Sequence, residues 1–339
     1  MYTWNAWKGY KKVVTRNETI DYIKGLAIIS VISAHCNAVL DTTNRLAVMS
    51  SLLLQNIGTL GVICFFVISG MLFHHPGKDV RQFFDKKIRN IIIPWFISAT
   101  CVYLYVYLRK PPITLKGCLN FVLGNGSYCY YLTVLMVLYA LFTLLPFMRK
   151  NSVLLICEGI TVVSTVWFYS IGGVNPYLNI FNWIGYFALG VQISENQEIW
   201  KKIKKYASTK SLTLVTISGG GYMLLLLHQL YHQKGGGYWN GINVVDCWIG
   251  AITMVLIAIR IENAKDNVIK RIVHQAGVVS YGIYIWHMPI AGIVVKVFQY
   301  GTLLNFVAIR PVVILMIMLL SIHFVKVIIP LKFRHYLGV

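Results

Sequence analysis

Apolar stretches of 16 to 25 residues, separated by short polar segments, recur along the whole chain. A helix rises about 1.5 Å per residue, so each stretch is long enough to cross the hydrocarbon core of a bilayer. The pattern therefore predicts an all-α, polytopic membrane helix bundle. We place ten transmembrane helices at about residues 20–40, 53–73, 88–108, 129–148, 152–171, 178–194, 211–230, 243–260, 279–299 and 303–330.

Composition agrees with this pattern. Hydrophobic residues make up 57% of the 339 residues and charged residues only 12%, whereas a soluble protein of this size is about 25% charged. A net charge of +20 would suit a nucleic-acid partner. We predict no such partner, because the positive charges lie in short segments between the apolar spans, as they do at the cytoplasmic side of membrane proteins.

The positions of Lys and Arg predict the orientation. With the N-terminus in the cytoplasm, 22 of the 31 Lys and Arg residues lie in inner segments and five in outer ones. We therefore predict both termini inside (N-in/C-in). The chain divides into a cytoplasmic tail at 1–19, a ten-helix bundle at 20–330 and a second tail at 331–339. No segment outside the membrane is long enough for another domain, so we predict a single domain over 1–339.

The first apolar stretch contains three ionisable residues: Asp21, Lys24 and His35. Such groups are costly in hydrocarbon, so they mark a functional hypothesis. Lys24 and His35 are eleven residues apart, roughly 16 Å along a helix axis. One helix would therefore carry a cation near the inner membrane face and an imidazole toward the outer face.

His35 has two interpretations. It is a histidine held by hydrogen bonds inside the bundle, or a general base for a hydroxyl nucleophile, since neutral imidazole accepts a proton near pH 7. Its neighbours Ser33, Cys36 and Asn37 form a polar cluster on an otherwise apolar helix. That cluster and the shared helix with Lys24 favour the functional interpretation.

A basic segment precedes the third span. Lys86 and Arg89 are three residues apart and share a helical face. A plain cytoplasmic excess of positive charge explains the charge of this segment. It does not explain the position of Arg89 at the start of the apolar run, where it could hold a phosphate. Phosphate-bearing donors such as coenzyme A are cytoplasmic.

Two more motifs lie within spans. Ser69 and Gly70 follow Phe65-Phe66 in the second span, and this bulky-then-small pattern predicts close helix packing at Gly70. His287, near the middle of the ninth span, follows Tyr284 by three residues. Aromatic residues at span ends are usually interfacial anchors, but a histidine at mid-span is not explained in that way.

These motifs together resemble the acyltransferase-3 family of integral membrane acyltransferases, and the resemblance covers nearly the whole chain. Lysine stands here at 24 and at 86, where the family has arginine, which keeps the charge but loses the bidentate fork. The matching motifs, in order, are Asp21-x-x-Lys24-Gly25 followed after ten residues by His35; Phe65-Phe66-Val67-x-Ser69-Gly70; Lys86-x-x-Arg89 with Pro94 after it; and Ser280-Tyr281-x-x-Tyr284-x-x-His287.

The resemblance implies a function. The family moves acyl groups, most often acetyl, from cytoplasmic acyl-CoA to hydroxyls of envelope carbohydrates, and it works as a multi-pass protein of the cell membrane. By this resemblance Lys86, Arg89 and Lys24 bind the donor. His35 acts as the catalytic base on the acceptor hydroxyl, or as a transient acyl carrier. We expect supporting roles for Asp21, which would fix Lys24, for Ser69, and for Tyr284 and His287, which would shape the acceptor site.

Other interpretations stay open. A transporter or flippase of a lipid-linked sugar explains ten spans and a polar interior without catalysis, and an inactive sensor would bind no donor. We expect no metal, because the seven cysteines fall mostly within spans and show no metal-like spacing. The acyl group, the acceptor sugar and its hydroxyl, and the oligomeric state are not readable from the residues.

Overall fold

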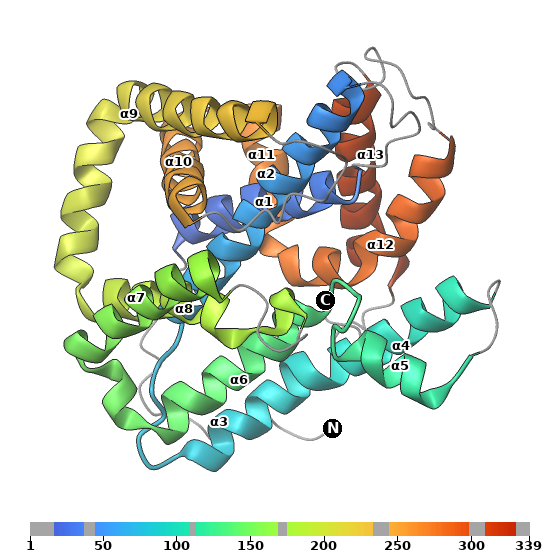
Figure 1. The fold of residues 1–339 in the computed structure, drawn as a ribbon, viewed down its shortest axis with the longest axis horizontal. Helices are drawn as coiled ribbons and strands as arrows, with labels where there is room; N and C mark the ends of the chain where they lie inside the picture. Colours follow the sequence, from blue (N-terminus) through green and yellow to red (C-terminus); the bar gives the residue numbers. More distant parts are fainter. Residues whose placement is uncertain are drawn as a thin grey trace, which may run out of the picture.

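The computed structural model describes residues 17–36, 45–108, 113–168, 175–232, 244–297 and 309–329. Throughout these ranges the regular elements are helices, which confirms the all-α fold class (Figure 1). The chain ends at 1–16 and 330–339, and Asn37, lie outside the described residues. The α-helices are α1 Glu18–Ala34, α2 Arg45–Met71, α3 Val80–Lys87, α4 Ile93–Tyr107, α5 Leu115–Val122, α6 Tyr130–Leu144, α7 Asn151–Trp167, α8 Ile184–Glu195, α9 Gln197–His232, α10 Val244–Asn263, α11 Val268–Val278, α12 Ser280–Val297 and α13 Arg310–His323.

Short helical turns join several of these helices. A π-helix, η1, at Ile88–Ile92 connects α3 to α4 without a break, and another, η6, at Phe324–Ile328 continues α13. Three 3₁₀ turns lie at Pro146–Arg149 (η2), Pro176–Leu178 (η3) and Ile180–Asn182 (η4). The last two stand between α7 and α8 and shape the segment that reaches the site described below.

Each of the ten predicted apolar segments overlaps a helix, but fewer helices are long and apolar enough to count as membrane spans. Within the described ranges four qualify: Leu53–Met71, Val80–Tyr107, Trp200–His228 and Arg310–Ile328. A fifth candidate is the pair Val268–Val278 and Ser280–Val295, bent by 95°. The described residues therefore contain four candidate spans, or five if the bent pair is one span. Ten spans and the N-in/C-in orientation stay predictions.

Two segments expected to be inner loops are helical instead. Of residues 195–210, Glu195 ends α8 and residues 197–210 form the first part of α9, which is kinked at Lys210. Residues 268–271 begin α11, where the side chain of Asn267 accepts a hydrogen bond from the backbone N–H of Lys270 at 2.9 Å. Charge alone suggested loops here. The segment 197–210 contains no glycine or proline, so nothing in it interrupts a helix.

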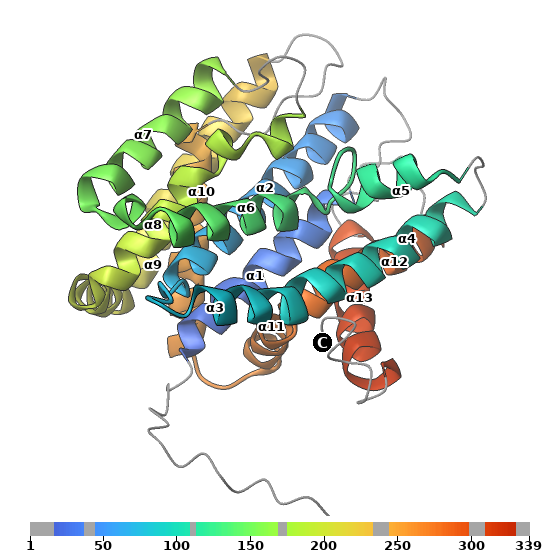
Figure 2. The same cartoon turned by 90° about the horizontal axis from the view of Figure 1, so that it is seen from below.

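Helix α1 lies at the centre of the bundle, against α2, α10, α11, α12 and α13 (Figures 1 and 2). Its buried apolar residues, such as Ile28 and Ile32, belong to the main core. Helix α2 approaches α1 closely because glycines face it. A Cβ on Gly61 would lie 2.2 Å from the carbonyl oxygen of Ala27. The polar residues of α1 are therefore held inside a tightly packed core.

A second close contact joins α2 to α8. A Cβ built on Gly70 would lie 2.1 Å from the carbonyl oxygen of Phe187, and one on Gly190 would lie 2.0 Å from that of Val67. Only glycine fits at either position, since these distances are far below van der Waals contact. The predicted close approach at Gly70 is confirmed, and the contact fixes the end of α2 that carries Ser69.

Candidate active site

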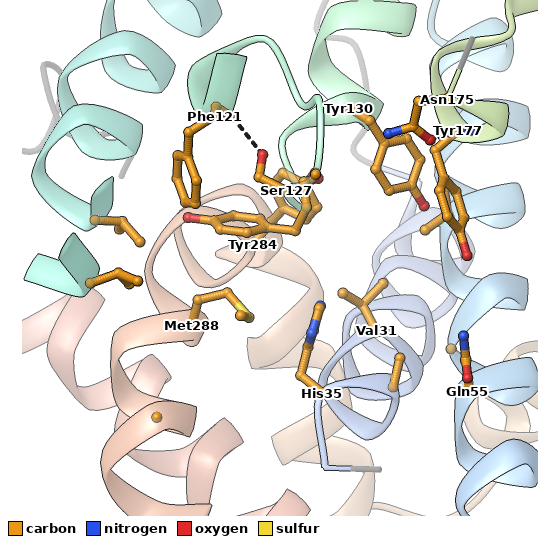
Figure 3. A pocket seen from close by; sticks show the side chains of 18 of the residues that line it. Val31, His35, Gln55, Phe121, Ser127, Tyr130, Asn175, Tyr177, Tyr284 and Met288 are labelled. Carbon is orange, nitrogen blue, oxygen red and sulfur yellow. Dashed lines mark hydrogen bonds between the residues drawn. The ribbon is translucent and has the colours of Figure 1, made fainter. Parts of the chain in front are cut away.

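His35 stands directly after the last residue of α1 and lines a partly open cavity of about 840 Å³. Its backbone N–H still bonds the carbonyl oxygen of Ile32, so the helical path continues to this residue. Figure 3 shows the imidazole projecting from α1 into the cavity, with Met288 and Tyr284 on one side and Gln55 on the other. The predicted catalytic residue therefore borders an open volume large enough for a substrate group.

The cavity has two kinds of wall. On one side stand Gln55 of α2, Asn175 and Tyr177 near η3, and Tyr130 of α6 (Figure 3). The rings of Tyr130 and Tyr177 lie 4.8 Å apart, centroid to centroid. The rest of the lining is more apolar and includes Val102, Val106, Phe121, Met288 and Gly292. The cavity thus presents amides and tyrosine rings on one side, and mainly apolar side chains together with Ser127 and Tyr284 on the other.

His287 of α12 lies beside His35. The two ring centroids are 5.0 Å apart and the ring planes are inclined at 46°. His287 is fully buried, and its Nδ1 lies 2.7 Å from the carbonyl oxygen of Tyr284 and 3.1 Å from that of Ile283. Two histidines that are 252 residues apart in the chain therefore meet, and His35 of this pair lines the cavity.

Two tyrosines enclose this histidine pair. Tyr128 lies 5.4 Å from His287 and 6.4 Å from His35, and Tyr284 lies 6.1 Å from His287, between ring centroids. The hydroxyl of Tyr128 donates to the carbonyl oxygen of Ile285 at 2.9 Å, and that of Tyr284 donates to the carbonyl oxygen of Tyr128. These bonds tie α12 to the segment before α6 and fix the ring positions.

Ser69 reaches the same cluster through Tyr131. The two hydroxyl oxygens are 3.1 Å apart, and the Tyr131 ring lies 5.5 Å from the ring of Tyr284. The structure thus brings together His35, Tyr284, His287 and Ser69, four of the residues selected from the sequence.

Lys24 and Asp21 lie on the N-terminal half of α1, against α11. Asp21 Oδ1 is 4.0 Å from Lys24 Nζ, and Asp21 Oδ2 is 4.0 Å from Nε2 of His274 on α11. The Asp21 side chain is 4% exposed, while those of Lys24 and His274 are 25% and 34% exposed. The expected Asp21–Lys24 pair is present, and His274 joins it.

Lys86 and Arg89 lie on other elements than Lys24. Both side chains are exposed, on α3 and on η1. Lys87, between them, points inward instead: its Nζ lies 3.9 Å from the ring centroid of Tyr139 and 5.2 Å from that of Phe83. The residues predicted to bind the donor therefore form two groups on separate elements, Lys24 on α1 and the Lys86–Arg89 face on α3 and η1.

Sequence reasoning did not select several residues of the site. From the sequence alone, Tyr128 and Tyr130 could equally stack on a sugar ring or anchor a span end, and His274, Gln55 and Tyr177 carry no signal. Asn175 before Pro176 marks a turn and could have located the segment, but not its contact with α6. Among the described residues, no group of three or more His, Cys, Asp or Glu is placed to hold a metal ion.

The fold and the site define an all-helical membrane protein with a partly open cavity that His35 lines and that His287 supports from behind. A family model described as an acyltransferase domain matches residues 17–326. The chain belongs to the acyltransferase-3 family, and it is therefore a membrane acyltransferase. Comparisons with curated proteins and with solved structures found no match.

Proposed function

We propose that this protein is an O-acetyltransferase, which moves the acetyl group of cytoplasmic acetyl-CoA to a hydroxyl of an envelope or lipid-linked carbohydrate. The observation that carries the proposal is the position of His35. It lines the cavity, while Lys24 lies roughly 16 Å away on the same helix. In the predicted orientation Lys24 is on the donor side and His35 is toward the acceptor side.

The donor side uses the basic residues. The exposed Lys86 and Arg89 would hold the phosphates of CoA, and Lys24, kept in place by Asp21, would contact the donor deeper in the bundle. Lys87, next to Lys86, turns inward and lies 3.9 Å from the ring centroid of Tyr139 on α6. Tyr131, eight residues before Tyr139 on α6, lies about 12 Å further along that helix, at Ser69. An extended pantetheine arm could span this depth without the CoA nucleotide crossing the membrane.

The reaction is a direct transfer. The acceptor O–H bond breaks as His35 takes the proton, and the alkoxide oxygen forms a C–O bond with the thioester carbon. The C–S bond then breaks, and the CoA thiolate receives the proton from His35. The products are the acetyl ester and free CoA, and His35 ends in its starting form. A transient acyl-histidine is the second route.

The cavity supports a carbohydrate acceptor. The tyrosine rings of Tyr130 and Tyr177 offer apolar faces for the C–H side of a sugar ring, and the amides of Gln55 and Asn175 offer donors and acceptors for hydroxyls. The apolar part of the lining suits a lipid-linked sugar. A flippase for such a lipid is the alternative, and it requires no base at His35.

Inverted membrane vesicles containing the protein, incubated with acetyl-CoA labelled in the acetyl group, test the proposal. We expect label in the envelope glycan with the wild type and a loss of at least about 100-fold in His35→Ala, the usual contribution of a general base. His323→Ala, at an exposed histidine of α13, serves as the matched control.

The outcomes separate the alternatives. Full transfer by His35→Ala would refute the mechanism. Absence of label with the wild type, combined with movement of a lipid-linked sugar, would favour the flippase. Mass spectrometry of the glycan, with succinyl-CoA as a competing donor, identifies the acyl group and the acceptor.

A further inference from the structure

The two ring nitrogens of His287 are in different situations. Nδ1 lies within hydrogen-bond distance of two backbone carbonyl oxygens, those of Ile283 and Tyr284. A carbonyl oxygen only accepts, so Nδ1 must carry the hydrogen. In neutral imidazole the other nitrogen, Nε2, is then an acceptor. Nε2 is buried and has no hydrogen-bond partner in the described structure.

A buried acceptor without a donor is costly, typically by about 1–3 kcal/mol, so the identity of its partner is informative. Three rings pack against His287: those of Tyr128, Tyr284 and His35. Both tyrosine hydroxyls already donate to backbone carbonyls, and each has only one hydrogen to give. Of these three rings, His35 is the one with an N–H still available, since its imidazole makes no hydrogen bond to a described residue.

We propose that His287 is a positioning residue, whose Nε2 accepts a hydrogen bond from one ring nitrogen of His35 and so fixes the tautomer of His35. The inference rests on the proposed function, in which His35 is the base. With one nitrogen of His35 protonated and directed at His287, its other nitrogen carries the lone pair that faces the cavity.

The geometry permits this bond. A centroid separation of 5.0 Å allows two imidazole edges to approach to about 3 Å between nitrogens, the length of an ordinary N–H···N bond. In the structure the rings are inclined at 46° and the bond is not yet made, so the His35 ring has to turn. Catalytic hydrogen bonds commonly tighten only when substrate is bound.

The arrangement performs the task of the third group in a catalytic triad, with an imidazole in place of a carboxylate. The bond strengthens when His35 takes the acceptor proton, because a charged donor makes a stronger hydrogen bond than a neutral one. His287 itself neither gains nor loses a proton. Its Nδ1–H stays on the carbonyls of α12, which holds the ring in place.

A matched pair of substitutions tests the assignment. In His287→Gln the amide oxygen can reach the position of Nε2, whereas in His287→Asn the amide reaches only the position of Nδ1. We expect kcat for acetyl transfer within about 10-fold of wild type for Gln and lower by about 100-fold or more for Asn, since a wrong tautomer removes the base. The KM for acetyl-CoA should stay within about threefold. Equal activity of the two variants would overturn the proposal.

Nitrogen-15 NMR of histidine-labelled protein at pH 8 reads the tautomer without any acyl transfer. The His35 signals are assigned by their loss in His35→Ala. We expect one fixed tautomer for His35 in the wild type and a tautomer mixture in His287→Asn. An unchanged His35 spectrum in His287→Asn would refute the pairing. Fixed pairing in a protein that transfers no acetyl would instead refute the proposed function and leave the pairing standing.

Discussion

Gly70→Ala should destabilise the bundle at the contact between α2 and α8. The added Cβ would lie 2.1 Å from the carbonyl oxygen of Phe187 and 3.0 Å from Cα of Gly190. An ordinary carbon–oxygen contact is about 3.3 Å or longer, so the two helices would have to separate by about 1.2 Å here. The obstacle is backbone, which no side-chain rotation can relieve.

The magnitude follows from two terms. Overpacking of a tight core costs about 1–3 kcal/mol. The shift also moves Ser69, next in the chain, away from Tyr131, and this 3.1 Å hydrogen bond contributes about 1 kcal/mol. We expect a loss of about 2–4 kcal/mol, which corresponds to a fall in Tm of about 4–8 °C for a long chain.

Thermal unfolding of the protein in lipid nanodiscs measures the effect, with a thiol-reactive dye that reports exposure of the buried Cys64 and Cys157. Gly220→Ala in α9 is the control, because a Cβ there meets nothing within 4 Å. Alanine should stabilise that helical position by up to about 1 kcal/mol. If Gly70→Ala and Gly220→Ala unfold at the same temperature, the argument from backbone contact is refuted.

Three further predictions concern the site. Ser69→Ala and Tyr131→Phe remove the same hydrogen bond, so each should slow acetyl transfer severalfold, and the double variant should be no slower than the singles in initial-rate assays. Asp21→Asn should raise the KM for acetyl-CoA severalfold with little change in kcat, because the carboxylate that holds Lys24 is lost; an unchanged KM would contradict this role. Tyr177→Ala should reduce transfer to glycan while calorimetric CoA binding stays unchanged, and weakened CoA binding would place this residue on the donor side instead.

Much of the helical fold could be predicted from the sequence. Apolar periodicity is a local property, and each predicted apolar segment overlaps a helix. The helices at 197–210 and 268–278 were missed, because charge suggested loops there and only the run of helix-forming residues argued otherwise. The 95° bend between α11 and α12 falls at Val279, which carries no proline or glycine signal of its own.

The site was partly predictable for a similar reason. His35, His287 and Tyr284 stood out because polar groups in an apolar helix are expensive, which is a property of one segment. Tyr177 and His274 did not stand out, because each gains its importance from a partner far away in the chain: the ring of Tyr130 and the carboxylate of Asp21. Tertiary contact creates that signal, and a single sequence does not contain it.

The bent pair α11 and α12 contacts α1 at both of its ends. On one side of the bend, His274 of α11 lies at Asp21, beside Lys24; on the other, His287 of α12 lies at His35. The first contact is rigid, because a Cβ on Gly277 would lie 1.8 Å from the carbonyl oxygen of Asp21. One bent pair of helices therefore touches both ends of α1. In the proposed mechanism, with the donor held at Lys24, we expect any shift of α11 to be carried along this pair to His287 and His35.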